Sequence, residues 1–217
     1  MHQYEDLYRT GHVRTARIVE PDGFIVDLVS PLREKGSKTI LDVGCGAGRN
    51  AVFLAKEGFY VVGVDISLTA LKLALERADN DGVRNCIFVL HDFLELPFPD
   101  THFDAAFSSY GIENVPLPRI KKALGEMKRV VRNGGLVLVT LHSPKHWRFG
   151  LGRKIGSHTY LTYDIIKGRK FKFLTHFFDK EMAERLFHNL DLKILSIREV
   201  VKISNKQRAH WIILSEK

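Results

Sequence analysis

The sequence has few cysteines and no long apolar run, and each absence excludes a class of protein. Cys45 and Cys86 are its only cysteines, which excludes a disulfide-stapled domain and suits a reducing cytoplasm. The apolar runs fall well short of the ~20 residues needed to cross a bilayer. The polar, acidic start Met1–Asp6 predicts no secretory signal. We therefore expect a cytoplasmic protein without a membrane span.

Acidic residues are scarce in the carboxyl-terminal half. Residues 1–118 carry 11 Lys/Arg and 17 Asp/Glu, a net charge of −6, whereas residues 119–217 carry 22 and 8, a net charge of +14. Eight basic residues and one acid lie within His142–Lys172. Such a field attracts a polyanion or an anionic small substrate. The alternative is the Lys-rich surface of a heat-adapted protein, which the low glutamine content (Gln3 and Gln207) favours.

The first two thirds of the chain alternate short apolar runs with helical patterns. The runs do not alternate in polarity, so they predict strands buried on both faces of a parallel sheet. The alternation predicts an α/β, Rossmann-like, doubly wound sheet with helices on both faces. The expected strands are Thr39–Val43, Tyr60–Val64, Cys86–Leu90, Phe103–Ser108 and Leu136–Leu141; the expected helices are Ala51–Glu57, Leu68–Ala78 and Leu117–Val131, the last closed by Asn133–Gly135.

The two ends of the chain follow other patterns. The first 30 residues indicate helical pieces broken by Gly11, Pro21 and Pro31, which we expect over the mouth of the sheet. After residue 142 a basic stretch leads to the aromatic run Phe173–Phe178, and Asp179 is expected to cap a helix. The last two strands, Leu192–Val201 and His210–Leu214, predict an antiparallel pair at one sheet edge.

A glycine-rich turn follows the first predicted strand. Gly44, Gly46 and Gly48 allow a ligand to approach the backbone, and Asp65, 21 positions after Gly44, supplies a carboxylate for a ribose diol. A dinucleotide site has these features too, but its pattern is G-x-G-x-x-G, whereas this turn is G-x-G-x-G. Asp42 precedes the turn, where it would repel a pyrophosphate and attract an ammonium or a sulfonium.

Four segments in order resemble the class I S-adenosylmethionine-dependent methyltransferases. They span roughly Thr39–Leu141 and read LDVGCGAGRNAVFLA, VVGVDIS, HDFLELPFPDTHFDAAFSSYGIEN and LGEMKRVVRNGGLVLVTL. The resemblance implies one methyltransferase domain over residues 1–217, with S-adenosyl-L-methionine as cofactor. Within it we expect an N-terminal helical cap (1–38), a cofactor-binding core (39–142), a basic insertion (143–178), and a C-terminal helix and strand pair (179–217).

By this resemblance, nine residues at the strand ends hold the cofactor. They are Asp42, Gly44, Gly46 and Gly48 at its methionine part, Asp65 at the ribose, Ile66, Asp92 and Phe93 at the adenine, and Ser108 near the methyl group. Short segments near both ends, Tyr4–Tyr8 and Ala209–Leu214, are also similar to the tellurite-resistance-type branch. There an N-terminal helix closes over the cofactor, which would bring Tyr4, Tyr8, Arg14 or Arg17 close to it.

Candidate catalytic residues follow the fourth and fifth strands. They are Tyr110, Glu113, His142 and His146. Asn114 stands where many relatives place the histidine of an acid–His pair, which argues against base catalysis from this loop, so we select His142, with Tyr110 second. The alternative is that His142 is structural, and a thiolate or amine acceptor would need no base. His142 and His146 follow a strand and flank Pro144, so we expect no helical metal pair and no metal.

These observations favour a methyltransferase that acts on a small-molecule acceptor by in-line displacement, and the basic half of the chain would attract an anionic one. The D/N-P-P-Y loop typical of methylation at planar exocyclic nitrogens is absent, and Ser108–Gly111 takes its place. A tRNA or rRNA methyltransferase that uses the basic half, and a non-catalytic cofactor-binding partner subunit, are the alternatives. The sequence leaves open the oligomeric state and whether the acceptor atom is O, N or S.

Overall fold

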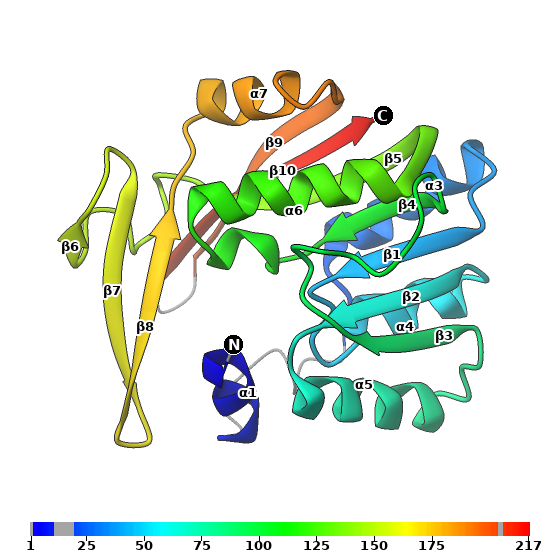
Figure 1. The fold of residues 1–217 in the computed structure, drawn as a ribbon, viewed down its shortest axis with the longest axis horizontal. Helices are drawn as coiled ribbons and strands as arrows, with labels where there is room; N and C mark the ends of the chain where they lie inside the picture. The colour runs from blue at the N-terminus through cyan, green and yellow to red at the C-terminus, as the bar shows by residue number, and fades with distance from the viewer. Residues whose placement is uncertain (1, 11–19, 204–205) are drawn as a thin grey trace.

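A seven-stranded sheet forms the centre of the computed structural model, which describes residues 2–10, 20–203 and 206–217 (Figure 1). The strand order is β3-β2-β1-β4-β5-β10-β9. Neighbours among the first five are parallel, and β10 pairs antiparallel with β5 and β9. The strands are β1 (Thr39–Val43), β2 (Tyr60–Asp65), β3 (Cys86–Leu90), β4 (Phe103–Ser108), β5 (Val131–His142), β9 (Lys193–Ile203) and β10 (Gln207–Glu216). The predicted mostly parallel α/β sheet with an antiparallel edge pair is confirmed.

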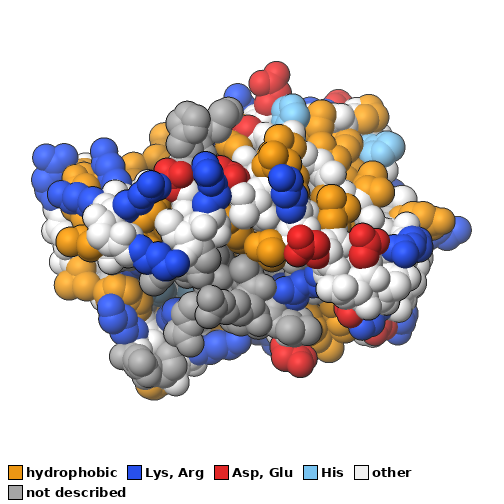
Figure 2. All heavy atoms as spheres, turned by 90° about the horizontal axis from the view of Figure 1, so that it is seen from below, with side chains coloured by type: hydrophobic (Ala, Val, Ile, Leu, Met, Phe, Trp, Pro, Cys, Tyr) orange, Lys and Arg blue, Asp and Glu red, His pale blue; other side chains and the backbone are white. Residues whose placement is uncertain are grey.

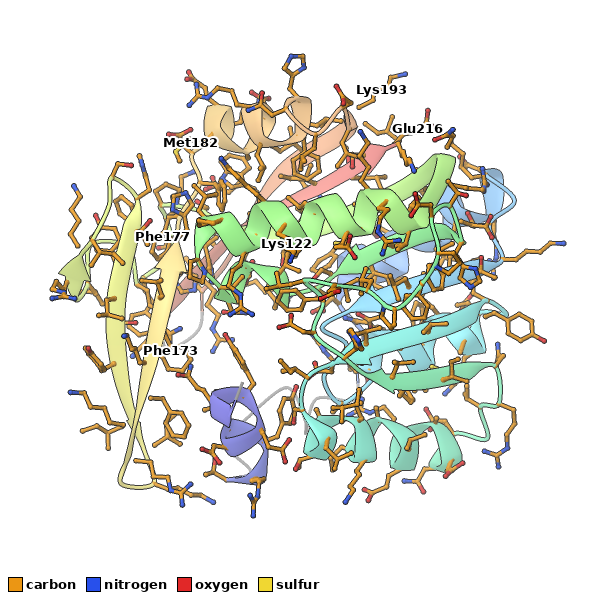
Figure 3. The ribbon with its side chains drawn as sticks, viewed as in Figure 1. Lys122, Phe173, Phe177, Met182, Lys193 and Glu216 are labelled. Carbon is orange, nitrogen blue, oxygen red and sulfur yellow. The ribbon has the colours of Figure 1, made fainter. Side chains whose placement is uncertain are left out.

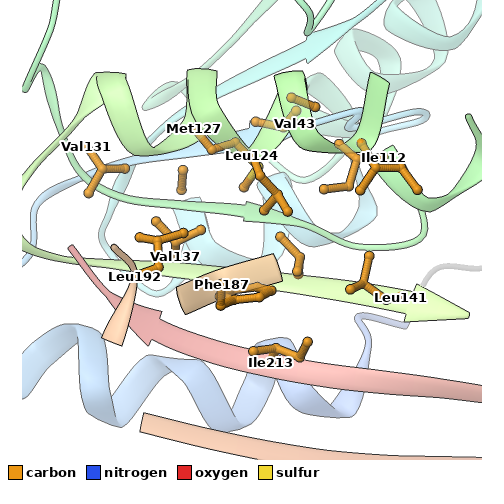
Figure 4. Close-up of a cluster of buried hydrophobic side chains, with 14 of the residues drawn as sticks. Val43, Ile112, Leu124, Met127, Val131, Val137, Leu141, Phe187, Leu192 and Ile213 are labelled. Atoms are coloured by element: carbon orange, nitrogen blue, oxygen red, sulfur yellow. The ribbon is translucent and has the colours of Figure 1, made fainter. Parts of the chain in front are cut away.

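Helices cover both faces of this sheet. On one face, α6 (Leu117–Val130) and α7 (Lys180–His188) pack Leu124, Met127 and Phe187 against the strands (Figure 4). On the other face lie α3 (Gly23–Glu34), α4 (Arg49–Lys56) and α5 (Leu68–Asn80). Because the central strands β1 and β4 and most of β5 are buried on both sides, their apolar runs show no alternation. None of the described helices is long and apolar enough to cross a membrane.

Three details of the predicted elements were wrong. Pro31 does not break the N-terminal helix: α3 runs through it, since Phe24, Leu28 and Leu32 bury one face against the sheet. This contact also places α3 on a sheet face and not over the mouth of the sheet. The segment Asn133–Gly135 does not close α6, which ends at Val130; it belongs to β5, whose pairing with β4 is irregular there. Gly11 lies outside the described residues.

A second sheet of three antiparallel strands was not predicted. It consists of β6 (Arg153–Lys154), β7 (Thr159–Ile166) and β8 (Arg169–His176). Lys167 and Gly168 both have positive φ, as in a two-residue hairpin turn between β7 and β8. Figure 2 shows lysines and arginines gathered at the end of the molecule that this sheet forms. The boundaries given above for cap, core, insertion and C-terminal part stay a prediction.

Candidate functional site

The glycine turn joins β1 to α4 in a conformation that requires glycine. Gly46 has φ +56° and Gly48 has φ +74°. A Cβ on Gly48 would lie 2.8 Å from the Cβ of Ala74, and one on Gly46 would collide with the Tyr8 hydroxyl. The turn therefore presents bare backbone toward α1 (His2–Arg9) and packs tightly on α5.

Two carboxylates lie at the carboxyl ends of β1 and β2. Asp42 is buried, and its Oδ2 has no hydrogen-bond partner among the described residues. Burial, and then the nearby Asp65 carboxylate, raise the pKa of Asp42 well above its ordinary value. Asp65 accepts hydrogen bonds from the backbone N–H groups of Gly46 and Ser67, both at 2.9 Å, and burial raises its pKa. This end of the sheet thus holds a buried and a partly buried carboxylate, both with raised pKa values.

Helix α1 lies at this edge and is fixed by its own side chains. Glu5 accepts hydrogen bonds from the Ser67 hydroxyl (2.7 Å) and the Thr69 backbone N–H (3.1 Å). The Tyr4 hydroxyl donates to the Asn114 carbonyl at 2.7 Å, and burial raises the pKa of Tyr4 to about 12. Leu7 packs against the second sheet. The helix therefore bridges α5 and the second sheet beside the glycine turn; Arg14 and Arg17 lie outside the described residues.

Two small cavities, of about 80 and 100 Å³, follow the turn between α1 and the sheet. Of the nine residues predicted to hold the cofactor, six line them: Asp42, Gly44, Gly46, Asp65, Ile66 and Phe93. The other three do not. Gly48 packs on α5, Asp92 pairs with Arg119 at 3.2 Å, and Ser108 is buried, donating to the Val43 carbonyl and accepting from the Ile112 N–H.

These residues fit the S-adenosylmethionine that the resemblance implies. Asp42 Oδ2 lacks a partner that an ammonium group could supply, and Asp65 sits where a ribose diol would meet a strand end. Gly46 lies against Tyr8, where only a residue without a side chain fits. Ile66 and Phe93 form an apolar surface beyond Asp65 that suits a purine ring.

Tyr110 separates these cavities from a third and larger one, and lines all three. Its backbone has φ +57°, an uncommon conformation for a bulky residue, and its N–H donates to the Thr140 hydroxyl at 2.8 Å. Its ring packs edge-on against Phe24 and His210. Burial raises the pKa of Tyr110, so the hydroxyl stays protonated at neutral pH and can donate a hydrogen bond.

The third cavity measures about 500 Å³ and opens on the far side of Tyr110. Its lining combines aromatic and imidazole rings with basic side chains. Among the residues that form it are Arg49, Tyr110, Glu113, His142, His146, Trp147, Arg148, Lys202, Arg208 and His210. Phe177, just after β8, is buried at the junction of the two sheets, and its ring lies 5.6 Å from that of His142 (Figure 3). The space suits a small planar molecule, and its basic side chains lie beside three acidic ones, Glu20, Asp22 and Glu113.

Three histidines meet at the inner wall of this cavity, and we call His142, His146 and His210 the histidine cluster. One ring nitrogen from each lies within 4.8 Å of the others, and all three side chains are buried. Glu113, in the 3-10 helix η1 (Ile112–Asn114), places its Oε1 3.3 Å from Nε2 of His210 and 3.6 Å from Nε2 of His142.

The charges in this cluster follow from burial. Burial lowers the pKa of His142 to about 4, against the attraction of Glu113, and lowers that of His146 to about 3. Burial alone would raise the pKa of Glu113, but the neighbouring His142 and His210 outweigh it and hold that pKa at about 2. At neutral pH the ionised Glu113 carboxylate therefore lies beside the uncharged imidazole of His142, with that of His146 also uncharged.

Sequence reasoning selected Tyr110 and His142 but did not bring the cluster together. His210 is the cross-strand partner of His142 in the β5–β10 pairing, 68 positions apart along the chain. The expectation of no metal pair considered only the spacing of His142 and His146. A prediction of the pairing register between the fifth and last strands would have revealed the third histidine.

The comparisons with known proteins find methyltransferases. Residues 40–135 match the model of a methyltransferase domain. A demethylmenaquinone methyltransferase from Thermus thermophilus is 39% identical over 121 residues, 54% of each chain. A 2-phytyl-1,4-naphtoquinone methyltransferase from Nostoc punctiforme is 38% identical over 117 residues, 52% of this chain and 50% of the relative. The chain thus aligns with about half the length of these curated relatives.

Solved structures share the fold over a longer stretch. An S-adenosylmethionine-dependent methyltransferase from Methanosarcina mazei matches with a TM-score of 0.72 at 24% identity, covering 83% of this chain and 92% of that one. A 1,6-didemethyltoxoflavin-N1-methyltransferase from Burkholderia thailandensis matches with a TM-score of 0.71 at 15% identity, covering 99% of this chain and 85% of that one. At these identities the likeness concerns the fold.

Proposed function

We propose that the chain, in which residues 40–135 match a methyltransferase domain, is a class I S-adenosylmethionine-dependent methyltransferase that methylates a small molecule held in the 500 Å³ cavity. The observation that carries the proposal is Tyr110, which lines both the cavities of the glycine turn and the large cavity. A methyl donor on one side of this residue and an acceptor on the other would meet beside it. The reaction would take place in the cytoplasm.

The cofactor supplies a methyl group on a sulfonium, which is already an activated leaving group. The protein's main task is then alignment, worth effective molarities of order 10⁵–10⁸ M in favourable cases. Asp42, Asp65 and the glycine turn would bind the cofactor from the strand ends. Tyr110, fixed by Phe24 and Thr140, would position the acceptor through its hydroxyl.

The acceptor class follows from the lining of the large cavity. Trp147 and Tyr110 offer aromatic surfaces, and Arg148, Lys202 and Arg208 offer positive charge. A planar ring compound suits this combination, and the quinones in the names of the curated relatives contain such a ring. Hydroxylated naphthoquinones are therefore the first acceptors to screen.

His142 is our candidate for the group that takes a proton from an acceptor hydroxyl. It lines the large cavity, and its Nε2 lies 3.6 Å from a Glu113 oxygen that would stabilise a protonated ring. Replacing it (His142→Ala) should slow methyl transfer by about 10²–10⁴-fold and leave cofactor affinity unchanged. Steady-state rates and calorimetry on the same preparation measure both quantities. Unaltered turnover would remove His142 from the chemistry.

The first test is a calorimetric titration with S-adenosylmethionine, followed by an acceptor screen that detects the demethylated cofactor. Binding and turnover support the proposal, and turnover with any acceptor excludes a non-catalytic subunit. Sound folding without cofactor binding would overturn the assignment.

A tRNA or rRNA acceptor is the second candidate, favoured by the exposed basic residues of the second sheet, such as Lys154, Lys170 and Lys172. Titration with total tRNA at two salt concentrations separates the two. RNA binding through phosphate contacts weakens steeply as salt rises. A weak interaction with a flat salt response would leave the small-molecule acceptor.

A further inference from the structure

We propose that the histidine cluster and Glu113 form a binding site for one divalent transition-metal ion of the Zn²⁺ type, at the inner wall of the large cavity. Three imidazoles and one carboxylate are a common ligand set for such an ion, since imidazole nitrogen suits Zn²⁺ and its neighbours in the first transition series. Metal binding does not itself require methyl transfer. Only its use toward an acceptor rests on the proposed function.

The separations between the side chains match those of ligands that share one ion, although Glu113 and His210 are also within hydrogen-bond range of each other. Zn²⁺ binds imidazole nitrogen at ~2.0–2.1 Å, so two ligands of a tetrahedral site lie about 3.3–3.4 Å apart. Glu113 Oε1 lies 3.3 Å and 3.6 Å from the Nε2 atoms of His210 and His142. A strong hydrogen bond to an ionised carboxylate is shorter, about 2.7–2.9 Å. One ring nitrogen of each histidine lies within 4.8 Å of the other two, so the imidazoles must move closer together around an ion.

The lack of hydrogen-bond partners for several atoms of these side chains also supports a bound ion. Neither ring nitrogen of His142 has a hydrogen-bond partner among the described residues. Glu113 Oε2 also lacks one. Buried polar atoms in proteins are nearly always paired, so a group of unpaired ones in a single wall is unusual. The three rings and the carboxylate are only 1–7% exposed, so bulk water does not replace the missing partners. A bound cation would satisfy them together.

His146 is the weakest of the three expected ligands. Its Nδ1 accepts a hydrogen bond from the backbone N–H of Arg148 at 3.2 Å. Metal binding through Nε2 places the ring proton on Nδ1, so this hydrogen bond must break. We therefore expect the loss of His146 to weaken metal binding less than the loss of His210 or Glu113.

The site faces the cavity, so a bound ion could take a further ligand from that side. Arg148, Lys202 and Arg208 line the same space and favour an anionic ligand over water. An oxygen atom of an anionic acceptor would thus bind the metal, which lowers the pKa of a coordinated hydroxyl and fixes its orientation. In that state His142 would act as a metal ligand and not as a proton acceptor.

The test uses the full chain without a histidine tag, dialysed against a chelator. Zn²⁺ is titrated by calorimetry, metal content is measured by elemental analysis, and Co²⁺ serves as a spectroscopic probe. We expect one ion per chain and an intense visible Co²⁺ spectrum without a thiolate charge-transfer band, because Cys45 and Cys86 are not ligands. His210→Ala and Glu113→Gln should each weaken Zn²⁺ binding by at least about 100-fold, and His146→Ala by about tenfold.

The matched control is His188→Ala, which removes an exposed histidine of α7 and should leave Zn²⁺ affinity unchanged. Glu113→Gln keeps the shape of the side chain, and circular dichroism verifies its folding. The inference is overturned if the wild-type chain takes up no stoichiometric metal, or if His210→Ala binds Zn²⁺ as tightly as the control. Titration of the metal-free chain with S-adenosylmethionine is independent: its failure would remove the proposed function and leave the metal site standing.

Discussion

At the amino end of the sheet, Asp104 accepts hydrogen bonds from the Lys38 and Thr39 backbone N–H groups and from the Arg132 guanidinium, at 2.7–2.9 Å. Burial would raise its pKa, but these donors hold it at about 2. At the carboxyl end of the same sheet, Asp42 leaves one oxygen without a partner, and the pKa values of both Asp42 and Asp65 are raised.

The carboxylates at the amino and carboxyl ends of the sheet differ in how fully their oxygens are hydrogen-bonded, and we interpret this as a difference in role. Donors around Asp104 contribute to folding, since hydrogen bonds to an ionised group contribute more than neutral ones. The carboxylates at the other end lower the stability of the protein alone and keep acceptors available for a ligand. Buried polar groups without partners are uncommon, and they gather where a molecule binds. The following predictions test this contrast, from the largest expected effect to the smallest.

Gly48→Ala should cost the largest amount of folding free energy, roughly 2–5 kcal/mol. The left-handed backbone costs about 1–2 kcal/mol with a side chain, and a Cβ 2.8 Å from Ala74 adds overpacking of about 1–3 kcal/mol. Denaturant unfolding of Gly48→Ala and of the wild-type protein measures this loss of folding free energy. Gly82→Ala is the control: φ is +68° but no neighbour lies within 4 Å, so only the backbone term should appear. Equal losses would show that the turn is not tightly packed on α5.

Asp104→Ala should lower the free energy of unfolding by about 2–3 kcal/mol at neutral pH, and leave cofactor affinity unchanged. The folded-state pKa is depressed, so the contribution is present above pH ~4 and is lost as pH falls toward about 2. The free energies of unfolding of the two proteins, measured with urea, should therefore approach each other as the pH falls from neutral to ~2.5. The exposed Asp79 provides the control, since Asp79→Ala should change stability by less than ~0.5 kcal/mol. A constant difference across this range would argue against the depressed pKa.

Asp65→Ala should weaken S-adenosylmethionine binding by roughly 1–3 kcal/mol, the scale of hydrogen bonds to a charged group. Calorimetry measures the affinity. Asp104→Ala is the matched comparison, because it should lower the stability of the protein and leave its affinity for S-adenosylmethionine unchanged. Unchanged affinity in Asp65→Ala would mean that the ribose lies elsewhere.

Asp42→Asn should raise the stability of the cofactor-free protein by about 1 kcal/mol and weaken cofactor binding. Because the folded-state pKa of Asp42 is raised, its ionisation above pH ~4 opposes folding, and the amide removes this cost. Thermal unfolding at neutral pH detects the change as a shift of about 2–4 °C. A lower melting temperature would show that the Asp42 carboxylate has a stabilising partner.

Much of the cofactor side could be predicted because its signals are local. The strand Thr39–Val43, the glycine turn and Asp65 lie within 27 consecutive residues, and a parallel strand–turn–helix unit places such residues at one edge. The bounds of β3 and β4 agreed with the prediction. Ser108 illustrates the limit: its position near the site was predictable, but its burial beneath Tyr110 depends on the close packing of Val43 and Ile112.

The sequence by itself determined the doubly wound sheet, the glycine turn and the acidic strand ends, since periodicity and turn chemistry act between near neighbours. Tertiary structure alone decided the large cavity, the second sheet and the histidine cluster. His210 reaches His142 only through the register of two antiparallel strands, and Glu113 approaches both from a separate 3-10 turn. Contacts between distant segments depend on how the packed elements fit together, and no local pattern in the chain encodes that fit.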